Sequence, residues 1–216
     1  MENSPQNNFQ TKLWENKFGD DYIDRNKTIS EINQVYQNMF GMTLEELYGK
    51  FFLNLDKSIK ILELGCNIGL NLSILKKFGF ENLSGLDINK RAISIAKQNN
   101  PEITFFNTSI ESFETKEKFD LVFTSGVLIH IHPNHVNSIV KKIFKLSKKF
   151  IFGFEYYSKQ LTEINYRDNA NICWKQDFPF LFQKLYPALK IISQEKFYHK
   201  SNDLCDIGYL FEKSYE

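Results

Sequence analysis

The N-terminal part of the chain carries its apolar side chains at the spacing of amphipathic helices. Between residues 10 and 52, apolar residues recur three to four positions apart, which is the period of one helix face. Gly19 and Gly41 interrupt this pattern, and Thr28 or Ser30 suits the N-cap position of a helix. The pattern predicts two or three short helices in this region.

From residue 61 onward, short apolar runs alternate with helical stretches. The runs predict strands at residues 61–64, 83–87, 103–106, 119–124 and 150–154. Helical spacing follows the first run as far as Gly79, follows the second as far as Pro101, and resumes after Pro133. Strands that alternate with helices through short connections are typical of a parallel sheet covered by helices on both faces.

The C-terminal part predicts a different arrangement. Helical spacing over residues 176–185 leads to Pro187, and two extended runs follow at residues 190–198 and 207–212. The short polar stretch between these two runs is long enough for a hairpin but too short for a parallel crossover. We therefore expect an antiparallel pair of strands at one edge of the sheet.

Together, these patterns predict an α/β fold with a doubly wound, mostly parallel sheet of seven strands. An antiparallel C-terminal strand and an N-terminal helical extension complete it. We find no internal repeat and no low-complexity linker. We expect residues 1–52 to form a helical cap and residues 53–216 to form the ligand-binding domain, the two being a single structural unit.

The composition agrees with one globular domain and excludes several functions. The chain has 216 residues, 42% of them hydrophobic and 25% charged. A net charge of +1 is too small for a protein that binds bulk nucleic acid through a basic surface. No apolar run approaches the roughly 18 residues of a membrane-spanning helix. The first residues carry no export signal, so we expect a cytoplasmic protein.

The cysteines give no sign of a disulfide framework or a metal site. Cys66, Cys173 and Cys205 lie far apart and form no pair with the spacing of metal ligands. We therefore expect reduced thiols and no bound metal.

The sharpest motif follows the first predicted strand. Residues 63–69 read Glu-Leu-Gly-Cys-Asn-Ile-Gly, and their glycines allow a tight turn close to a ligand. Asp87 ends the next strand, 22 residues after Gly65, where a carboxylate accepts hydrogen bonds from both ribose hydroxyls. The two features predict an adenosine-containing ligand. Asn67 stands where the dinucleotide fingerprint has its second glycine, and Asn is the residue that best replaces glycine at positive φ.

Over residues 61–131 the sequence resembles the class I S-adenosylmethionine-dependent methyltransferases. Residues 63–69 correspond to the acidic-x-G-x-G-x-G loop of that family with its middle glycine replaced, and Asp87 corresponds to the ribose-binding acid. Residues 107–110 correspond to the lining of the adenine site, and residues 119–123 to the fourth-strand motif. The two C-terminal strands agree with the strand that this family inserts at the end of the sheet.

A closer resemblance is to the methylases associated with pseudaminic acid biosynthesis. It is carried by residues 14–26, residues 126–131 and two short segments after residue 154. This resemblance implies that the acceptor is a small polar molecule, a hydroxyl-bearing precursor of bacterial surface sugars.

The resemblance also implies that the loop binds S-adenosyl-L-methionine, which leaves as S-adenosyl-L-homocysteine. In this architecture an N-terminal extension closes over the cofactor, and an arginine there can pair with its carboxylate. The implied cofactor-binding residues are Trp14, Tyr22, Arg25, Glu63, Gly65, Asn67, Gly69, Asp87, Ile88, Ser109, Ile110, Thr124 and Ser125. Alternatively, the aromatic residues of the extension belong to the core of the cap, and its arginine is a solvated charge.

Transfer to a hydroxyl benefits from a base, and histidine is the side chain best suited to that role near neutral pH. His130 is the first candidate and His132 the second, because both follow the fourth strand. The alternative is that His130 packs against the sheet. His135 and His199 are expected at the surface.

The segment after the fifth strand is rich in tyrosine, asparagine and charge. Tyr156, Tyr157, Tyr166 and Arg167 suit a polar acceptor such as a sugar, and Arg167 suits a carboxylate or phosphate on it. An ordinary mobile loop is the alternative.

Three other functions fit the same fold. A nucleotide-sugar or NAD-dependent oxidoreductase is disfavoured by the missing fingerprint glycine and by the absence of a Tyr-x-x-x-Lys pair. A non-catalytic cofactor-binding partner subunit is disfavoured by the intact loop and Asp87. RNA methylation is disfavoured by the charge balance.

Overall fold

A computed structural model describes residues 5–25 and 27–214, so residues 1–4 and 26 of the predicted cap, and residues 215–216, lie outside the description. In the described N-terminal region the chain forms four helices where two or three were predicted. They are α1 (Pro5–Glu15), α2 (Lys17–Ile23), α3 (Ile29–Phe40) and α4 (Leu44–Phe52). The additional break falls at Asn16, whose side chain donates to the Lys12 carbonyl at 2.7 Å. Neither glycine nor proline marks this break in the sequence.

The caps of these helices follow local chemistry. Thr28, one of the two predicted N-caps, begins α3 with a capping box in which its hydroxyl and the Glu31 carboxylate each accept from the other residue's N–H. Gly41 ends α3 in the left-handed conformation, with φ at 80°, as predicted. Gly19 lies inside α2 rather than at a helix end, so that prediction was wrong.

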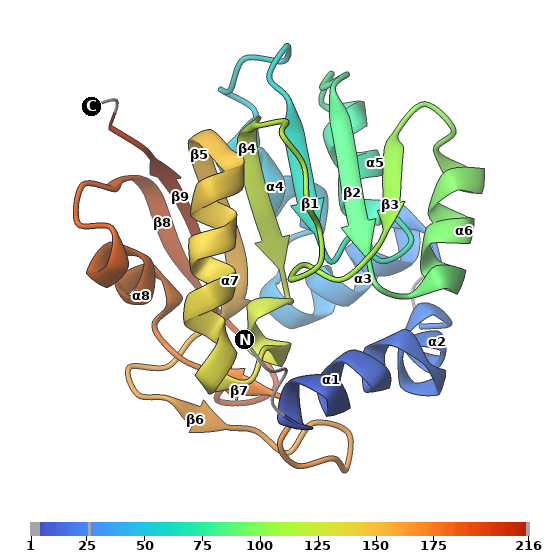
Figure 1. Cartoon of the computed structure of the whole chain (residues 1–216), viewed down its shortest axis with the longest axis vertical. Helices are drawn as coiled ribbons and strands as arrows, with labels where there is room; N and C mark the ends of the chain where they lie inside the picture. Colours follow the sequence, from blue (N-terminus) through green and yellow to red (C-terminus); the bar gives the residue numbers. More distant parts are fainter. Residues whose placement is uncertain (1–4, 26, 215–216) are drawn as a thin grey trace.

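Seven strands form one sheet in the order β3-β2-β1-β4-β5-β9-β8 (Figure 1). Their bounds are β1 (Ile61–Leu64), β2 (Leu83–Asp87), β3 (Thr104–Asn107), β4 (Phe119–Ser125), β5 (Ser147–Tyr156), β8 (Lys190–Tyr198) and β9 (Cys205–Glu212). Strands β1 to β5 pair in parallel, and β9 pairs antiparallel with both β5 and β8. This arrangement confirms the predicted doubly wound sheet with an antiparallel edge.

The segment between β5 and α8 (Phe178–Leu185) contains structure that the sequence did not predict. A small hairpin pairs β6 (Thr162–Glu163) with β7 (Trp174–Lys175). A single 3-10 turn, Leu128–His130, also follows β4. Strands of two residues and one-turn helices are too short to produce a periodic pattern, so sequence periodicity cannot reveal them.

Helices cover both faces of the sheet. Helices α4, α5 (Leu70–Lys77) and α6 (Lys90–Asn99) contribute to one apolar core, and α7 (Pro133–Leu146) and α8 to the other. Along β1, Ile61 belongs to the first core and Leu62 to the second. Figure 1 shows α7 in front of the sheet and α4 behind it. Because both faces are covered, the strands read as continuous apolar runs.

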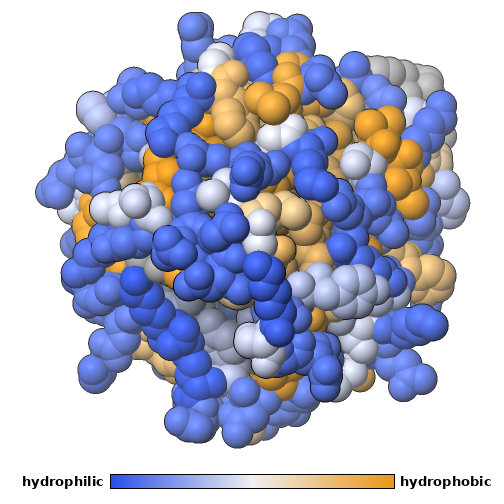
Figure 2. Space-filling model, turned by 180° about the vertical axis from the view of Figure 1, so that it is seen from behind, coloured by the Kyte–Doolittle hydropathy of each residue, from blue (hydrophilic) through white to orange (hydrophobic). Residues whose placement is uncertain are grey.

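The surface of the molecule is mostly polar. On the face opposite to the view of Figure 1, hydrophilic side chains surround separate smaller hydrophobic patches (Figure 2). Within the described part of the chain, no helix has the length and apolar character needed to cross a membrane.

Candidate functional site

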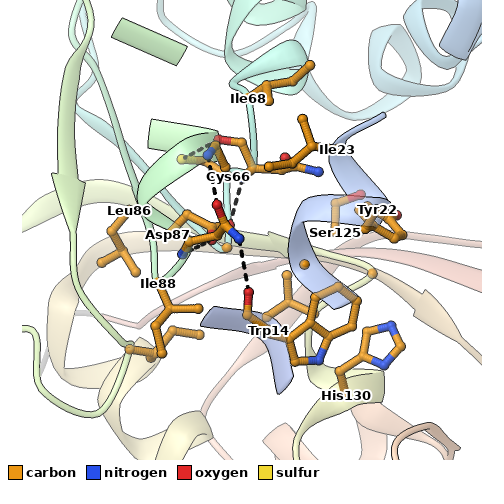
Figure 3. Close-up of a pocket in the computed structure, with 18 of the residues that line it drawn as sticks. Trp14, Tyr22, Ile23, Cys66, Ile68, Leu86, Asp87, Ile88, Ser125 and His130 are labelled. Atoms are coloured by element: carbon orange, nitrogen blue, oxygen red, sulfur yellow. Dashed lines mark hydrogen bonds between the residues drawn. The ribbon is translucent and has the colours of Figure 1, made fainter. Parts of the chain in front are cut away.

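A cavity of about 240 Å³ lies where the carboxyl ends of β1, β2 and β4 meet helices α1 and α2 (Figure 3). Its walls come from the loops after β1, β3 and β4, from the end of β2, and from the N-terminal helices. Ligands of open α/β sheets bind at this end of the strands. The topology therefore brings together residues that lie more than a hundred positions apart in the sequence.

The loop after β1 turns on three residues with positive φ, which are Gly65 at 75°, Asn67 at 47° and Gly69 at 79°. Asn67 thus adopts the left-handed conformation expected of it. A Cβ on Gly65 would lie 2.6 Å from Cγ2 of Val127, so a glycine is required where the loops after β1 and β4 meet. The Gly65 N–H donates to the Leu86 carbonyl at 2.8 Å and ties the loop to β2.

Asp87 ends β2 and faces this loop. Its Oδ2 accepts from the Asn67 N–H and its Oδ1 from the Asn89 N–H, both at 2.8 Å. Burial raises the pKa of Asp87, and these backbone hydrogen bonds act against the rise by stabilising the carboxylate. Each carboxylate oxygen keeps a second lone pair, and Asp87 lines the cavity. The geometry suits two ligand hydroxyls.

Glu63, Gly69 and Thr124 lie behind the cavity wall rather than along it. Glu63 is fully buried, its Oε1 accepts from Asn71 Nδ2 at 2.6 Å, and burial raises its pKa to about 8. Gly69 is the N-cap residue of α5, and Thr124 is buried near the end of β4. None of these three residues is part of the cavity wall.

On the other side of Asp87, the cavity is lined by Ile88, Ser109 and Ile110. The Asn107 side chain donates to the Asp87 carbonyl at 3.1 Å and to the Ile88 carbonyl at 2.8 Å. This amide holds the ends of β2 and β3 together and fixes an apolar slot next to the carboxylate. Ser125, at the end of β4, lines the cavity as well.

Helices α1 and α2 cover the cavity, and both Trp14 and Tyr22 line it. The Asn89 side chain donates to the Trp14 carbonyl at 3.2 Å and to Asp20 Oδ1 at 3.0 Å. A Cβ on Gly19 would lie 2.0 Å from the Trp14 carbonyl oxygen. Gly19 is therefore required inside α2 by close backbone packing, which explains why it does not end a helix.

Two further contacts hold these helices against the sheet domain. Arg91 donates to both carboxylate oxygens of Asp24, at 2.8 and 3.2 Å, and the Gln10 side-chain oxygen accepts from the His132 N–H at 3.0 Å. Arg25 lies over the Tyr22 ring, with its guanidinium carbon 4.8 Å from the ring centre, and does not line the cavity.

His130 lies in the turn after β4 and lines the cavity beside Trp14, with their rings 4.6 Å apart. Its Nδ1 lies 2.8 Å from the Ile172 carbonyl, which can only accept, so Nδ1 carries the proton and Nε2 is unprotonated. Burial lowers its pKa to about 4, so the ring is neutral at pH 7. His132 lies outside the cavity and caps α7, where its Nδ1 accepts from the Asn134 N–H.

Comparison with known proteins finds methyltransferases similar to part of this chain. Residues 61–149 match the family model of a methyltransferase domain. Over 101 residues the chain is 30% identical to the ribosomal protein L11 methyltransferase of Dictyoglomus thermophilum, and over 122 residues 28% identical to the ubiquinone biosynthesis O-methyltransferase of Rickettsia typhi. These matches cover 45% and 48% of this chain, but only 33% and 49% of the two relatives. The chain thus spans half or less of the curated relatives that it matches.

The solved structures agree on the fold. Magnesium protoporphyrin IX methyltransferase from Synechocystis PCC 6803 with bound S-adenosylmethionine aligns over 99% of this chain and 100% of its own length. The TM-score is 0.67, at 14% sequence identity. Residues 61–149 thus match a methyltransferase domain, and the chain shares the fold of this solved methyltransferase.

One structural residue of the methyltransferase fold was not recognised in the sequence. Glu155 is the last residue but one of β5, is 1% exposed, and accepts from the backbone N–H groups of Val127 at 3.2 Å and Ile129 at 3.4 Å. Burial raises its pKa to about 7. Glu155 holds the loop that carries His130, and the only signal for it in the sequence is a carboxylate at a strand end.

None of the four residues predicted to bind the acceptor lines the cavity of the methyltransferase domain, but two lie next to it. The Tyr166 ring meets the His130 ring edge-on, with centres 5.0 Å apart. The Arg167 guanidinium lies over the Tyr166 ring at 5.4 Å. The structure thus brings Tyr166 and Arg167 together with His130.

Tyr156 and Tyr157 face the C-terminal hairpin instead. The Tyr156 ring centre lies 6.0 Å from that of His199, and Lys196 Nζ lies 3.7 Å above the Tyr157 ring. The prediction that His199 lies at the surface was wrong, because its side chain is 3% exposed and its Nε2 bonds Asp206 Oδ2 at 3.1 Å. The hairpin packs against the end of α3, where the His199 ring meets the Phe40 ring and becomes buried, whereas residues 200–203 of the turn stay exposed.

Other residues of the methyltransferase cavity were not identified from the sequence. They lie on helix faces and in or near the loops at the strand ends. They include Gln10, Thr11, Ile23, Ile32, Tyr36, Cys66, Asn71 and Asn89. Helical periodicity marks a buried face, but it does not distinguish a face that packs on protein from one that packs on a ligand.

Proposed function

We propose that the whole protein is an S-adenosylmethionine-dependent methyltransferase that acts on a hydroxyl of a small polar acceptor. The observation that carries this proposal is the convergence of three features on one cavity. These are the glycine-rich loop after β1, the Asp87 carboxylate and the neutral His130 ring. A bound S-adenosylmethionine supplies a methyl group activated by its sulfonium, so the enzyme mainly has to align the acceptor and exclude water.

The cofactor-binding residues follow from the cavity wall. Asp87 accepts from the two ribose hydroxyls, and the slot formed by Ile88, Ser109 and Ile110 holds the adenine. Gly65, Asn67 and Ser125 face the methionine part, supported from behind by Glu63, Gly69 and Thr124. Trp14 and Tyr22 cover it, and Arg25 pairs with its carboxylate. In this proposal residues 1–52 act as the cap of the domain formed by residues 53–216.

His130 is the proposed general base. Its proton is fixed on Nδ1 by the Ile172 carbonyl, so Nε2 is free to accept a proton from the acceptor hydroxyl. A pKa of about 4 keeps the ring unprotonated at neutral pH, although it also makes the ring a weaker base than an exposed histidine. His132 is the second candidate, but it lies outside the cavity.

The proposed acceptor is a precursor of bacterial surface sugars, of the kind on which pseudaminic acid-associated methylases are found. Tyr166 and Arg167 support this assignment because they lie beside His130 and offer polar groups suited to sugar hydroxyls and acids. Tyr156 and Tyr157 belong to the same segment and extend the proposed acceptor surface towards β8 and β9.

Calorimetry with S-adenosylhomocysteine and with NAD tests the proposal. We expect S-adenosylhomocysteine to bind with micromolar affinity and NAD not to bind at millimolar concentration. Binding of NAD instead would select an oxidoreductase on the same fold. Binding of S-adenosylhomocysteine without any transfer of labelled methyl from S-adenosylmethionine to a broad set of sugars and sugar phosphates would favour the non-catalytic partner subunit.

A further inference from the structure

A continuous row of aromatic rings borders the proposed transfer site. Tyr22 packs on Trp14 with ring centres 5.4 Å apart, Trp14 packs on His130 at 4.6 Å, and His130 packs on Tyr166 at 5.0 Å. The first three line the cavity, and Figure 3 shows them along one side of it. We call these four residues the aromatic row.

An arginine stands at each end of the aromatic row. Arg25 lies over Tyr22 at 4.8 Å and Arg167 over Tyr166 at 5.4 Å. Burial raises the pKa of Tyr22 to about 12, and the charges of both arginines oppose this rise, so both guanidinium groups lie within electrostatic reach of one ring. Arginine is scarce here, with three residues against 24 lysines. Two of the three arginines of the chain, with their planar guanidinium groups, therefore lie at the ends of the aromatic row.

Neither arginine has a carboxylate partner within residues 5–25 and 27–214, whereas Arg91 pairs with Asp24. Nη1 of Arg25 is buried without a hydrogen-bond partner in that part of the chain. The negative charge of Asp87 contributes to the raised pKa of Tyr22, and the Asp87 carboxylate already accepts from two backbone N–H groups. The described part of the chain thus places two cations at the ends of the aromatic row without a carboxylate to neutralise either of them.

Two donors without a partner also border this cavity. Gln10 is 7% exposed, and its side-chain oxygen is occupied by the His132 N–H, so its NH₂ group is left over. Both Gln10 Nε2 and Trp14 Nε1 are buried without a partner among the described residues. The two side chains line the cavity. Because a buried donor without a partner is unfavourable, a site with two such donors is suited to a ligand that accepts from both.

We propose that the acceptor is an anion whose carboxylate or phosphate group lies against Arg167 and the free N–H groups of Gln10 and Trp14. This inference rests on the proposed function and names the class of its substrate. Arg25, on the far side of Tyr22, remains the partner of the cofactor carboxylate, so each anion has its own guanidinium. The acceptor hydroxyl then lies near His130, in the middle of the aromatic row.

The test uses the full-length protein saturated with S-adenosylhomocysteine. Three small molecules are titrated at constant ionic strength while tryptophan fluorescence is recorded. They are glycolate as the carboxylate, methyl phosphate as the phosphate and ethylene glycol as the neutral diol. We expect saturable millimolar binding of at least one anion and none of the diol. The better of the two anions distinguishes a sugar acid from a sugar phosphate. Arg167→Gln should weaken anion binding at least about tenfold, because a charge-assisted hydrogen bond is lost.

Lys159→Gln is the matched control, since it removes one positive charge from an exposed position in the same segment. It should leave anion binding unchanged, and Arg25→Gln should weaken S-adenosylhomocysteine binding but not anion binding. The inference is overturned if neither anion binds saturably, if the diol binds as well, or if Arg167→Gln has no effect. Failure of S-adenosylhomocysteine to bind at all would instead reject the proposed function.

Discussion

The two sides of the cavity are built in different ways. On the proposed cofactor side, the loop after β1 and the end of β2 use backbone conformation, with positive φ at Gly65 and Asn67 and backbone N–H groups that hold Asp87. On the proposed acceptor side, side chains from α1, from the turn after β4 and from the segment around Tyr166 meet through ring contacts. Backbone geometry suits a constant ligand, whereas exchangeable side chains suit an acceptor that differs between enzymes.

The largest expected effect is on the acceptor side. His130→Ala should reduce turnover about 10²-fold or more, because the proton acceptor is lost, while S-adenosylhomocysteine affinity stays the same. Initial rates of methyl transfer and calorimetry on the same preparation measure the two quantities. An unchanged rate would remove His130 from the mechanism, and an equal loss of cofactor affinity would make it a structural residue of the cavity.

On the cofactor side, Asp87→Ala should weaken S-adenosylhomocysteine binding by about 1–3 kcal/mol, which is about 5- to 150-fold, because a buried hydrogen-bonding acid is lost. Calorimetry measures this change directly. Asp203→Ala is the control, since Asp203 is exposed and lies outside the cavity. Equal effects of both substitutions would mean that the ribose site is elsewhere.

Gly65→Ala tests the backbone argument. A Cβ there meets Val127 at 2.6 Å, and φ is 75°, so we expect a loss of stability of about 1–3 kcal/mol and weaker cofactor binding. Adding Val127→Ala should restore part of the lost stability, because it removes the contact with the new Cβ. It should not restore the stability lost because alanine is strained at positive φ. Urea denaturation of the single and double variants measures both parts. A single variant as stable as the wild type would contradict the close approach of the two loops.

The smallest expected effect concerns the attachment of the N-terminal helices. Arg91→Ala removes an exposed ion pair with Asp24, so S-adenosylhomocysteine affinity should fall by about fivefold at most. Calorimetry at low and high salt should show this difference shrinking as salt screens the pair. A much larger loss would show that this ion pair alone holds the helices over the cavity.

The loop after β1 and Asp87 are easier to recognise in the sequence than the surroundings of His130 and Tyr166, and the reason is physical. The strand ends, the loop at residues 63–69 and Asp87 belong to a local strand–turn–helix unit, so their spacing is visible in the chain. The role of Glu155 and the burial of His199 depend on segments that meet only in the folded protein. Local patterns carry no record of such contacts.

The same distinction explains the errors in the N-terminal region. The capping box at Thr28 is readable because both partners lie three residues apart. The prediction that Gly19 ends a helix rests on the low helix propensity of glycine. Its actual role is to let the Trp14 carbonyl approach, which depends on how α1 and α2 pack.

A crystal structure of the protein with S-adenosylhomocysteine tests the central claim most directly. We expect electron density for the ligand in the cavity, with the ribose hydroxyls bonded to the Asp87 carboxylate and the sulfur directed towards His130 and the aromatic row. Density for the ligand at another site, or the same cavity with the ribose away from Asp87, would contradict it.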